Sequence, residues 1–160
     1  MELVTKIPKK MPKSFNRIWI HAIWATKNRK PLIDPKMDKE LHDYIMKKFQ
    51  EVGCPIRISN GYHDHVHCLF LLNPKRSLDE IIQRVKGSSS HFVNSNNFIN
   101  EKFTWQKGFG SFSVSESLNN RVYQYILNQK KHHQKKDFVE EYKSFLRLHN
   151  LDPEEDDMLK

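Results

Sequence analysis

The stretch PIRISNGYHDHVHCLFLL, residues 55–72, decides the fold that the sequence predicts. Segments rich in Ile, Val and Leu flank the pair Asn60-Gly61, which favours a tight turn between antiparallel strands. We therefore expect a β-hairpin here. Alternate residues of a strand share a face, so Val66, Cys68 and Phe70 should point toward a core.

Three histidines occur at the start of the second predicted strand. His65 and His67 should share the face opposite the core, and two imidazoles at this spacing can both reach one metal ion. His63 has the same parity but lies beside the predicted turn. Alternating histidines can also be ordinary surface residues of an open sheet, so the strand alone leaves both interpretations open.

Strand and helix patterns alternate on both sides of this hairpin. Gly53 ends one helical pattern, and Ser77 with Glu80 forms a capping box at the start of another. The predicted elements, in chain order, are a strand over 16–29, a helix over 34–53, the two hairpin strands, a helix over 77–87 with its end and a loop at 88–97, a strand over 103–115, and helices over 117–134 and 137–150.

This order is that of an α+β, ferredoxin-like (split βαβ) fold. It implies an antiparallel sheet with helices on one face, and the other face is free to carry a site or a partner. Further helices at the C-terminal end, one of which carries Tyr125, would complete the domain. Residues 15–150 should form a single domain, between a basic arm over 1–14 and an acidic tail over 151–160.

The charge of the chain points to a polyanionic partner. Its 160 residues carry a net charge of +8, and the acidic tail holds five acids and one Lys, so the preceding residues carry +12. Such an excess favours nucleic acid as a partner. Solubility alone would also explain it.

Cysteine usage and hydropathy indicate a cellular compartment. Cys54 and Cys68 lack the spacing of a metal site and suit a reducing environment. No apolar run approaches the roughly 18 residues that a membrane span needs, and the N-terminus lacks the apolar core of a secretory signal. We therefore expect a cytoplasmic protein with no membrane partner.

A second group of candidate residues lies on the helix predicted over 117–134. Tyr125 and Gln129 are four residues apart, so they project from one helix face. The Tyr125 hydroxyl can form a phosphodiester, and Gln129 offers a neutral oxygen ligand. A core tyrosine beside a solvated glutamine would give the same pattern.

Together, the two groups resemble the single-tyrosine HUH transposases of small bacterial insertion sequences, including the relatives associated with repeated extragenic palindromes (REP). The resemblance covers about residues 19–138, and order and spacing agree throughout. The elements that carry it are Asp64, His65-Val66-His67, KGSS at 86–89, WQKGFGSFSVS at 105–115, YILNQ at 125–129, and His132 with His133.

The resemblance implies a transposase that cuts and rejoins single-stranded DNA at hairpin-flanked element ends. Tyr125 would attack phosphorus and form a 5′-phosphotyrosine, leaving a free 3′-hydroxyl. A divalent metal ion, Mg²⁺ or Mn²⁺, would polarise a phosphate oxygen. His65 and His67 would bind this ion, with Gln129 as the third ligand.

The same resemblance implies a homodimer, because each chain has one such tyrosine and a mobile element has two ends. Whether the tyrosine serves its own chain or the partner stays open. Single-stranded DNA should lie over basic and aromatic surface. The candidate DNA contacts are Lys27, Arg29, Lys30, Lys75, Arg76, Arg84, Lys86, Lys130, Lys131, Lys135 and Lys136.

Other interpretations stay open at this point. A host-adopted REP-associated relative would keep the chemistry without the mobility. A non-catalytic nucleic-acid-binding domain of the same fold would bind DNA without cutting it. A metal-dependent hydrolase would cut with water and form no covalent adduct. The group that removes the tyrosine proton is also open between His63, His132 and a metal-bound water.

Overall fold

The computed structural model describes residues 14–159, so nearly all of the predicted basic arm lies outside the described residues. Four antiparallel strands form one sheet with the order β2-β3-β1-β4. The strands are β1 (Trp19–Ala25), β2 (Ile56–Gly61), β3 (His65–Leu71) and β4 (Gly110–Val114). This topology confirms the predicted α+β, ferredoxin-like fold.

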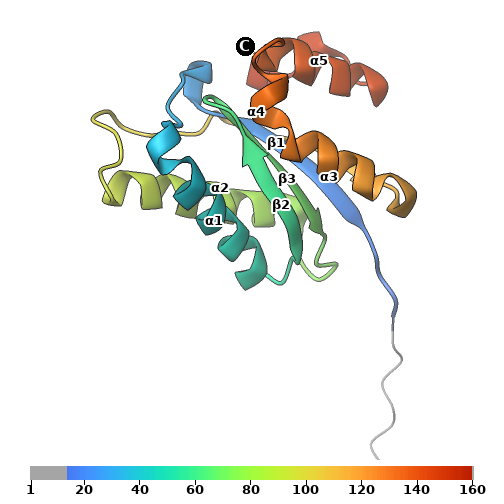
Figure 1. The fold of residues 1–160 in the computed structure, drawn as a ribbon. Helices are drawn as coiled ribbons and strands as arrows, with labels where there is room; N and C mark the ends of the chain where they lie inside the picture. Colours follow the sequence, from blue (N-terminus) through green and yellow to red (C-terminus); the bar gives the residue numbers. More distant parts are fainter. Residues whose placement is uncertain (1–13, 160) are drawn as a thin grey trace, which may run out of the picture.

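Helices pack on both faces of the sheet (Figure 1). One face is covered by α1 and α2, and the other is covered by the three C-terminal helices. The helices are α1 (Pro35–Glu51), α2 (Leu78–Ser95), α3 (Asn119–Leu127), α4 (Gln129–His132) and α5 (Phe138–Leu148).

The alternation predicted for β3 is confirmed. Val66, Cys68 and Phe70 lie in the main core with α1 and α2, whereas Leu69 packs against Ile126 of α3. The second face carries the histidines, as expected, and the C-terminal helices pack over them. Apolar residues on β1 and β3 are therefore buried on both faces, and their sequences are nearly continuous hydrophobic runs.

The hairpin turn lies later than the sequence indicated. Asn60 and Gly61 belong to β2, where they pair with His67 and Val66, and the turn is made by residues 62–64. Gly61 serves close packing instead of the turn, because a Cβ at this position would collide with the carbonyl oxygen of His65.

The ends of α1 and the start of α2 agree with the sequence. Gly53 has a positive φ of 75° just after α1, and the Ser77 hydroxyl accepts a hydrogen bond from the Glu80 amide at 3.1 Å. Yet α2 continues to Ser95, through the segment predicted as a helix end and a loop. Inward-facing Ser89 explains part of this, because its hydroxyl accepts a hydrogen bond from the Trp105 indole at 2.9 Å.

The last strand is shorter than predicted. β4 covers only Gly110–Val114, and before it Trp105 makes a single bridge with Thr26.

After α5, residues 151–159 return to the domain: Met158 is buried, and Asp156 accepts a hydrogen bond from the Tyr142 hydroxyl at 3.0 Å. Across the part of the chain that the structure describes, we find no helix with the length and apolarity that crossing a membrane requires.

Candidate metal and tyrosine site

The two strand histidines meet a carboxylate from α5 in the layer between the sheet and the C-terminal helices. His65 and His67 are fully buried, and their Nε2 atoms lie 3.7 Å and 2.8 Å from Oε1 of Glu141. His133, just after α4, places its Nε2 atom 2.9 Å from Oε2 of the same carboxylate. One potential ligand atom from each of these four residues lies within 4.8 Å of all the others.

Both residues predicted on the tyrosine helix reach this cluster. Gln129 is buried, with Oε1 lying 3.1 Å from the Nε2 atom of His65 and Nε2 donating to Glu141 Oε2 at 3.2 Å. The Tyr125 hydroxyl donates a short hydrogen bond to the same Oε2 atom. The structure thus brings Tyr125, His65, His67 and Gln129 together.

The hydrogen bonds of His65 test whether a metal ion fits. Asp64 Oδ1 lies 2.7 Å from the Nδ1 atom, and a carboxylate only accepts, so Nδ1 carries a hydrogen. In the neutral ring, Nε2 then has a free lone pair, which faces Gln129 Oε1. Two ligand atoms 3.1 Å apart can bind one ion as neighbours in its coordination shell. The cluster therefore fits a divalent ion, and the orienting contact of Asp64 is typical of metal-binding histidines.

His67 is oriented in a similar way by a neighbour on β1. Its Nδ1 atom lies 2.8 Å from the Nε2 atom of His21, which is also buried. Burial lowers the pKa of His67 to about 4, although the charge of Glu141 acts in the opposite direction. Burial likewise lowers the pKa of His21 well below its usual value. Both rings are therefore neutral near pH 7, and the neutral ring is the form that binds metals.

Glu141 and Tyr125 influence each other's ionisation. Burial alone would raise the pKa of Glu141, but its electrostatic interaction with His67 and its hydrogen-bond contacts with His133, His67 and Tyr125 hold this pKa well below its usual range. Burial, followed by the charge of Glu141, raises the pKa of the Tyr125 hydroxyl well above its usual value. The phenol is therefore protonated at neutral pH, and it loses its proton more easily once a cation offsets the Glu141 charge.

Sequence reasoning missed Glu141, His21 and the ligand position of His133. A signal for Glu141 was present, because it occupies the apolar stripe of α5 between Phe138 and Tyr142. An acid on the buried face of an amphipathic helix needs partners, so its placement already indicates a site. For His21, the only signal was a histidine inside an apolar strand.

The helix predicted over 117–134 is interrupted at Asn128, so that Tyr125 lies on α3 and Gln129 begins α4. Tyr123 points away from the cluster, and its ring lies 4.4 Å from the Arg57 guanidinium. Leu127, the last residue of α3, is 47% exposed.

Two histidines considered as proton acceptors differ in position. The His63 ring lies at a tilt against the Tyr62 ring, and its Nδ1 atom lies 3.3 Å from the Ile33 carbonyl oxygen. His132 lies beside Tyr125, with 5.4 Å between ring centroids, and its Nε2 atom is 3.2 Å from Glu141 Oε2. The geometry therefore favours His132 over His63 for contact with the tyrosine.

Several of the predicted DNA contacts have partners within the protein. Lys86 is buried, and its ammonium donates to the carbonyl oxygens of Gln106 at 2.8 Å and Gly108 at 2.6 Å. Burial lowers its pKa to about 8. Lys86 thus holds the segment before β4 and is not a free surface cation, contrary to its prediction as a DNA contact.

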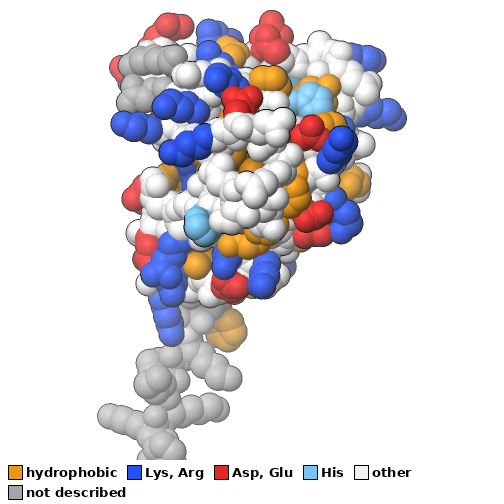
Figure 2. Space-filling view, turned by 90° about the vertical axis from the view of Figure 1, so that its left-hand side faces the viewer, with side chains coloured by type: hydrophobic (Ala, Val, Ile, Leu, Met, Phe, Trp, Pro, Cys, Tyr) orange, Lys and Arg blue, Asp and Glu red, His pale blue; other side chains and the backbone are white. Residues whose placement is uncertain are grey.

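The other basic candidates lie at the surface to different degrees. Lys27 and Lys131 are exposed, whereas Arg29 is half-buried and donates to the Met158 carbonyl oxygen at 3.4 Å. Ion pairs join Arg84 to Glu80 at 3.4 Å, Lys30 to Glu101 at 3.7 Å, and Lys130 to Asp38 at 2.8 Å. On the face drawn in Figure 2, Lys and Arg side chains lie among Asp and Glu side chains, so this face is not uniformly basic.

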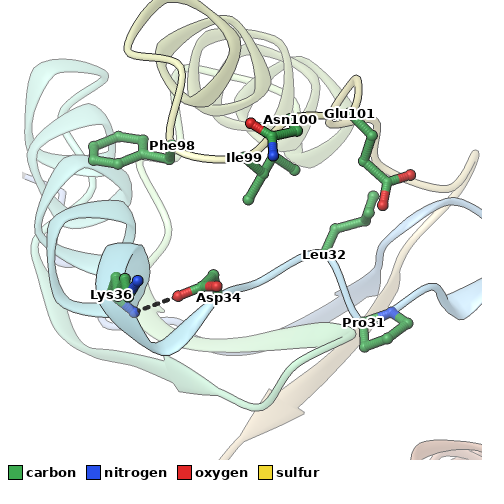
Figure 3. Close-up of a pocket in the computed structure, with 8 residues that line it drawn as sticks. All are labelled: Pro31, Leu32, Asp34, Lys36, Phe98, Ile99, Asn100 and Glu101. Atoms are coloured by element: carbon green, nitrogen blue, oxygen red, sulfur yellow. Dashed lines mark hydrogen bonds between the residues drawn. The ribbon is translucent and has the colours of Figure 1, made fainter.

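A groove of about 530 Å³ lies away from the cluster (Figure 3). Asp34 and Lys36, at the start of α1, line one side, and Phe98 with Glu101 lines the other. The dashed contact in the figure is the α1 cap, in which Asp34 Oδ1 accepts from the Lys36 amide at 2.7 Å. The lining shares no residue with the histidine cluster, so we assign the groove no role in the site.

The fold and the cluster define a class of protein: a ferredoxin-like domain whose strand histidines meet a tyrosine from a C-terminal helix. The family model described as "Transposase IS200 like" matches residues 14–129, which is most of the chain. The chain therefore belongs to the IS200-like transposase family. His133 and Glu141 lie beyond the matched residues.

Solved structures share the fold. A protein from Deinococcus radiodurans R1 that is assigned as a transposase, solved at 1.90 Å resolution, is 23% identical with a TM-score of 0.60, over 76% of this chain and 97% of its own. A REP-associated tyrosine transposase bound to a REP hairpin is 15% identical with a TM-score of 0.55, over 78% and 74% of the respective chains. No curated protein matches the chain.

Proposed function

We propose that the protein is a transposase that cuts and rejoins single-stranded DNA, with Tyr125 as the nucleophile. The observation that carries this proposal is the convergence of Tyr125, Gln129 and the two strand histidines on one carboxylate. A hydroxyl that can attack phosphorus thus lies beside a group of metal ligands. The membership of the family supports the same activity.

Each side chain has a defined task in this chemistry. His65, His67 and Gln129 would hold a divalent ion, and Glu141 and His133 extend the ligand set that the sequence predicted. The bound ion, Mg²⁺ or Mn²⁺, would neutralise charge on a non-bridging phosphate oxygen. Nitrogen ligands favour Mn²⁺ over Mg²⁺.

Tyr125 forms the new bond in the proposed reaction. Its hydroxyl oxygen attacks phosphorus, the 3′-oxygen leaves, and the strand stays attached to the protein through a 5′-phosphotyrosine. The covalent link conserves the phosphodiester bond, so rejoining needs no nucleotide cofactor. His132 could take the phenol proton by way of Glu141, because its Nε2 atom lies 3.2 Å from the carboxylate oxygen that accepts the Tyr125 hydrogen bond.

The DNA and the assembly follow from the same proposal. The substrate would be single-stranded DNA with hairpins near the element ends, bound through exposed cations such as Lys27 and Lys131. A homodimer would supply one tyrosine for each end. Within the described chain, the Tyr125 hydroxyl contacts Glu141, which also contacts His67 of the same chain, so one protomer holds all the parts of the proposed site.

The test uses single-stranded DNA from both flanks of the gene, labelled at the 5′ or the 3′ end, with Mn²⁺ or EDTA, and a denaturing gel. We expect a Mn²⁺-dependent protein adduct that carries the 3′ label and a released fragment that carries the 5′ label. Cleavage without an adduct would indicate a hydrolase. Binding without cleavage would indicate a non-catalytic domain. Hairpins in both flanks would favour a mobile element over a host-adopted relative.

A further inference from the structure

The interruption between α3 and α4 is held by a side chain from the sheet. α3 ends at Leu127, and the Nδ2 atom of Asn60 donates to the carbonyl oxygens of Ile126 at 2.9 Å and Leu127 at 3.2 Å. Carbonyl groups at the end of a helix need donors from outside the helix. A residue of β2 supplies the donor here, so the end of the tyrosine helix is tied to the sheet.

The same side chain also contacts the next helix. Lys130 of α4 donates to Asn60 Oδ1 at 2.7 Å, and its ammonium lies 2.8 Å from Asp38 Oδ2 of α1. Asn60 thus uses both ends of its amide, one toward α3 and one toward α4. Through Asp38, the contact between Asn60 and Lys130 is also connected to α1.

The position of Asn60 is coupled to that of the histidines. Asn60 pairs with His67 across the β2–β3 ladder, so one strand register places both residues. Tyr125 lies just before the carbonyls that Asn60 binds, and Gln129 lies just before Lys130. Fixing the angle between α3 and α4 therefore fixes both the nucleophile and the amide ligand relative to the His67 strand.

We propose that Asn60 is a positioning residue for the reaction, with Lys130 as its partner. Its amide sets the α3–α4 geometry that brings the Tyr125 hydroxyl and the Gln129 oxygen to the same point. The inference rests on the proposed function. It also gives Lys130 a task inside the protein, in place of the predicted contact with DNA.

The substitution Asn60→Asp tests the proposal with little change in size. A carboxylate cannot donate to the two carbonyls, so the α3 end loses its donor while Lys130 keeps an acceptor. Asn73→Asp is a matched control, because Asn73 Nδ2 also donates to a carbonyl just after a helix, that of Val52 at 3.1 Å. Asn73 follows the end of β3 that is opposite to His65. If Asn60→Asp does not fold, Lys130→Met removes the other contact of the link.

The first measurement is ¹⁹F NMR of metal-free protein labelled with 3-fluorotyrosine, with the Tyr125 signal assigned through Tyr125→Phe. The second is the rate of adduct formation at saturating DNA and Mn²⁺, together with DNA affinity. We expect Asn60→Asp to shift or broaden the Tyr125 signal and to slow adduct formation about tenfold or more, with unchanged DNA affinity, because small misplacements of reacting groups are costly. Asn73→Asp should leave all three unchanged.

A folded Asn60→Asp protein with an unchanged Tyr125 signal would overturn the proposal. A shifted signal with an adduct rate within twofold of the wild type would also overturn it, because the contact would then not serve the reaction. The two proposals fail separately. Absence of an adduct in the wild type refutes the proposed function, whereas an unaltered signal in Asn60→Asp refutes the role of Asn60 even when the wild type is active.

Discussion

The Tyr125 hydroxyl donates a hydrogen bond to Glu141, a carboxylate sixteen residues further along the chain. The other oxygen of Glu141 lies 2.8 Å from the Nε2 atom of His67. The proposed nucleophile and a proposed metal ligand therefore share one buried acid. This arrangement couples the protonation of the tyrosine to whatever charge the histidine cluster holds.

The histidines of β3 should differ sharply in their effect on cleavage. We expect His65→Ala or His67→Ala to abolish cleavage while hairpin binding stays largely intact, because the ion acts on the phosphate and binding depends on Lys and Arg. His63→Ala should be milder, since its ring lies near the Ile33 carbonyl and outside the cluster. Gel assays of cleavage and binding measure both effects. An inactive His63→Ala beside an active His65→Ala would contradict the assignment.

Glu141 should contribute directly to metal affinity. We expect Glu141→Gln to weaken Mn²⁺ binding at least about tenfold, given that loss of an outer partner of a metal site already costs about 10–100-fold. Calorimetric titration of the protein without DNA gives the affinity. Glu140→Gln is the matched control, because Glu140 is the exposed neighbour on α5. Equal affinities of the two variants would show that Glu141 does not bind the ion.

Acid should destabilise the metal-free protein through His67. Its pKa is about 4 in the folded state and 6.5 in the reference state, so the unfolded chain binds the extra proton between these values. The free energy of unfolding should then fall as the pH drops from about 6.5 to 4, by up to about 1.4 kcal/mol per pH unit for one such group. The depressed pKa of Glu141 acts in the same direction. It stabilises the folded state at pH values above the usual pKa of a glutamate, and this stabilisation is lost as the pH falls below that value.

Urea unfolding at pH 7, 6 and 5 measures this dependence. His67→Gln should reduce the slope between pH 6 and pH 5, because the substituted side chain does not titrate. If the variant and the wild type lose stability equally over this range, His67 is not held neutral by burial.

Two lysines predicted as DNA contacts should behave in opposite ways. Lys131→Gln should reduce the log–log salt dependence of single-strand binding by about 0.7, the value for one phosphate contact. Lys86→Met should leave this slope unchanged but lower the free energy of unfolding by about 1–3 kcal/mol, because two carbonyls lose their buried donor. Salt titrations of DNA binding and urea unfolding distinguish a DNA contact from a structural role. A reduced salt slope in Lys86→Met would contradict the structural role of Lys86.

Much of the fold could be predicted because it depends on short-range patterns. The alternation in β3 identified the faces of His65 and Val66, and the capping box at Ser77 identified the start of α2. The length of α2 was not predictable in this way, because Ser89 is held in the helix by Trp105 from a distant segment. The turn was misplaced because Gly61 serves a close approach of two strands, which the dipeptide alone does not reveal.

In the candidate site, too, short-range patterns predicted some residues, and contacts between distant segments determined the others. Tyr125 and Gln129 are four residues apart and were predicted together, although the helix between them is interrupted. Glu141 was missed, because its role depends on α5 folding back over the histidine face of the sheet. No local periodicity reports that contact, and only the presence of an acid in an apolar stripe hinted at it.

The central claim is that Tyr125 becomes covalently linked to DNA, and peptide mapping of the trapped adduct tests it most directly. Wild-type protein would be incubated with single-stranded hairpin DNA and Mn²⁺, digested with nuclease and protease, and analysed by mass spectrometry, with Tyr125→Phe and Tyr123→Phe in parallel. We expect the nucleotide mass on Tyr125, no adduct in Tyr125→Phe, and a normal adduct in Tyr123→Phe. A nucleotide on Tyr123, or an adduct that persists in Tyr125→Phe, would contradict the assignment of the nucleophile.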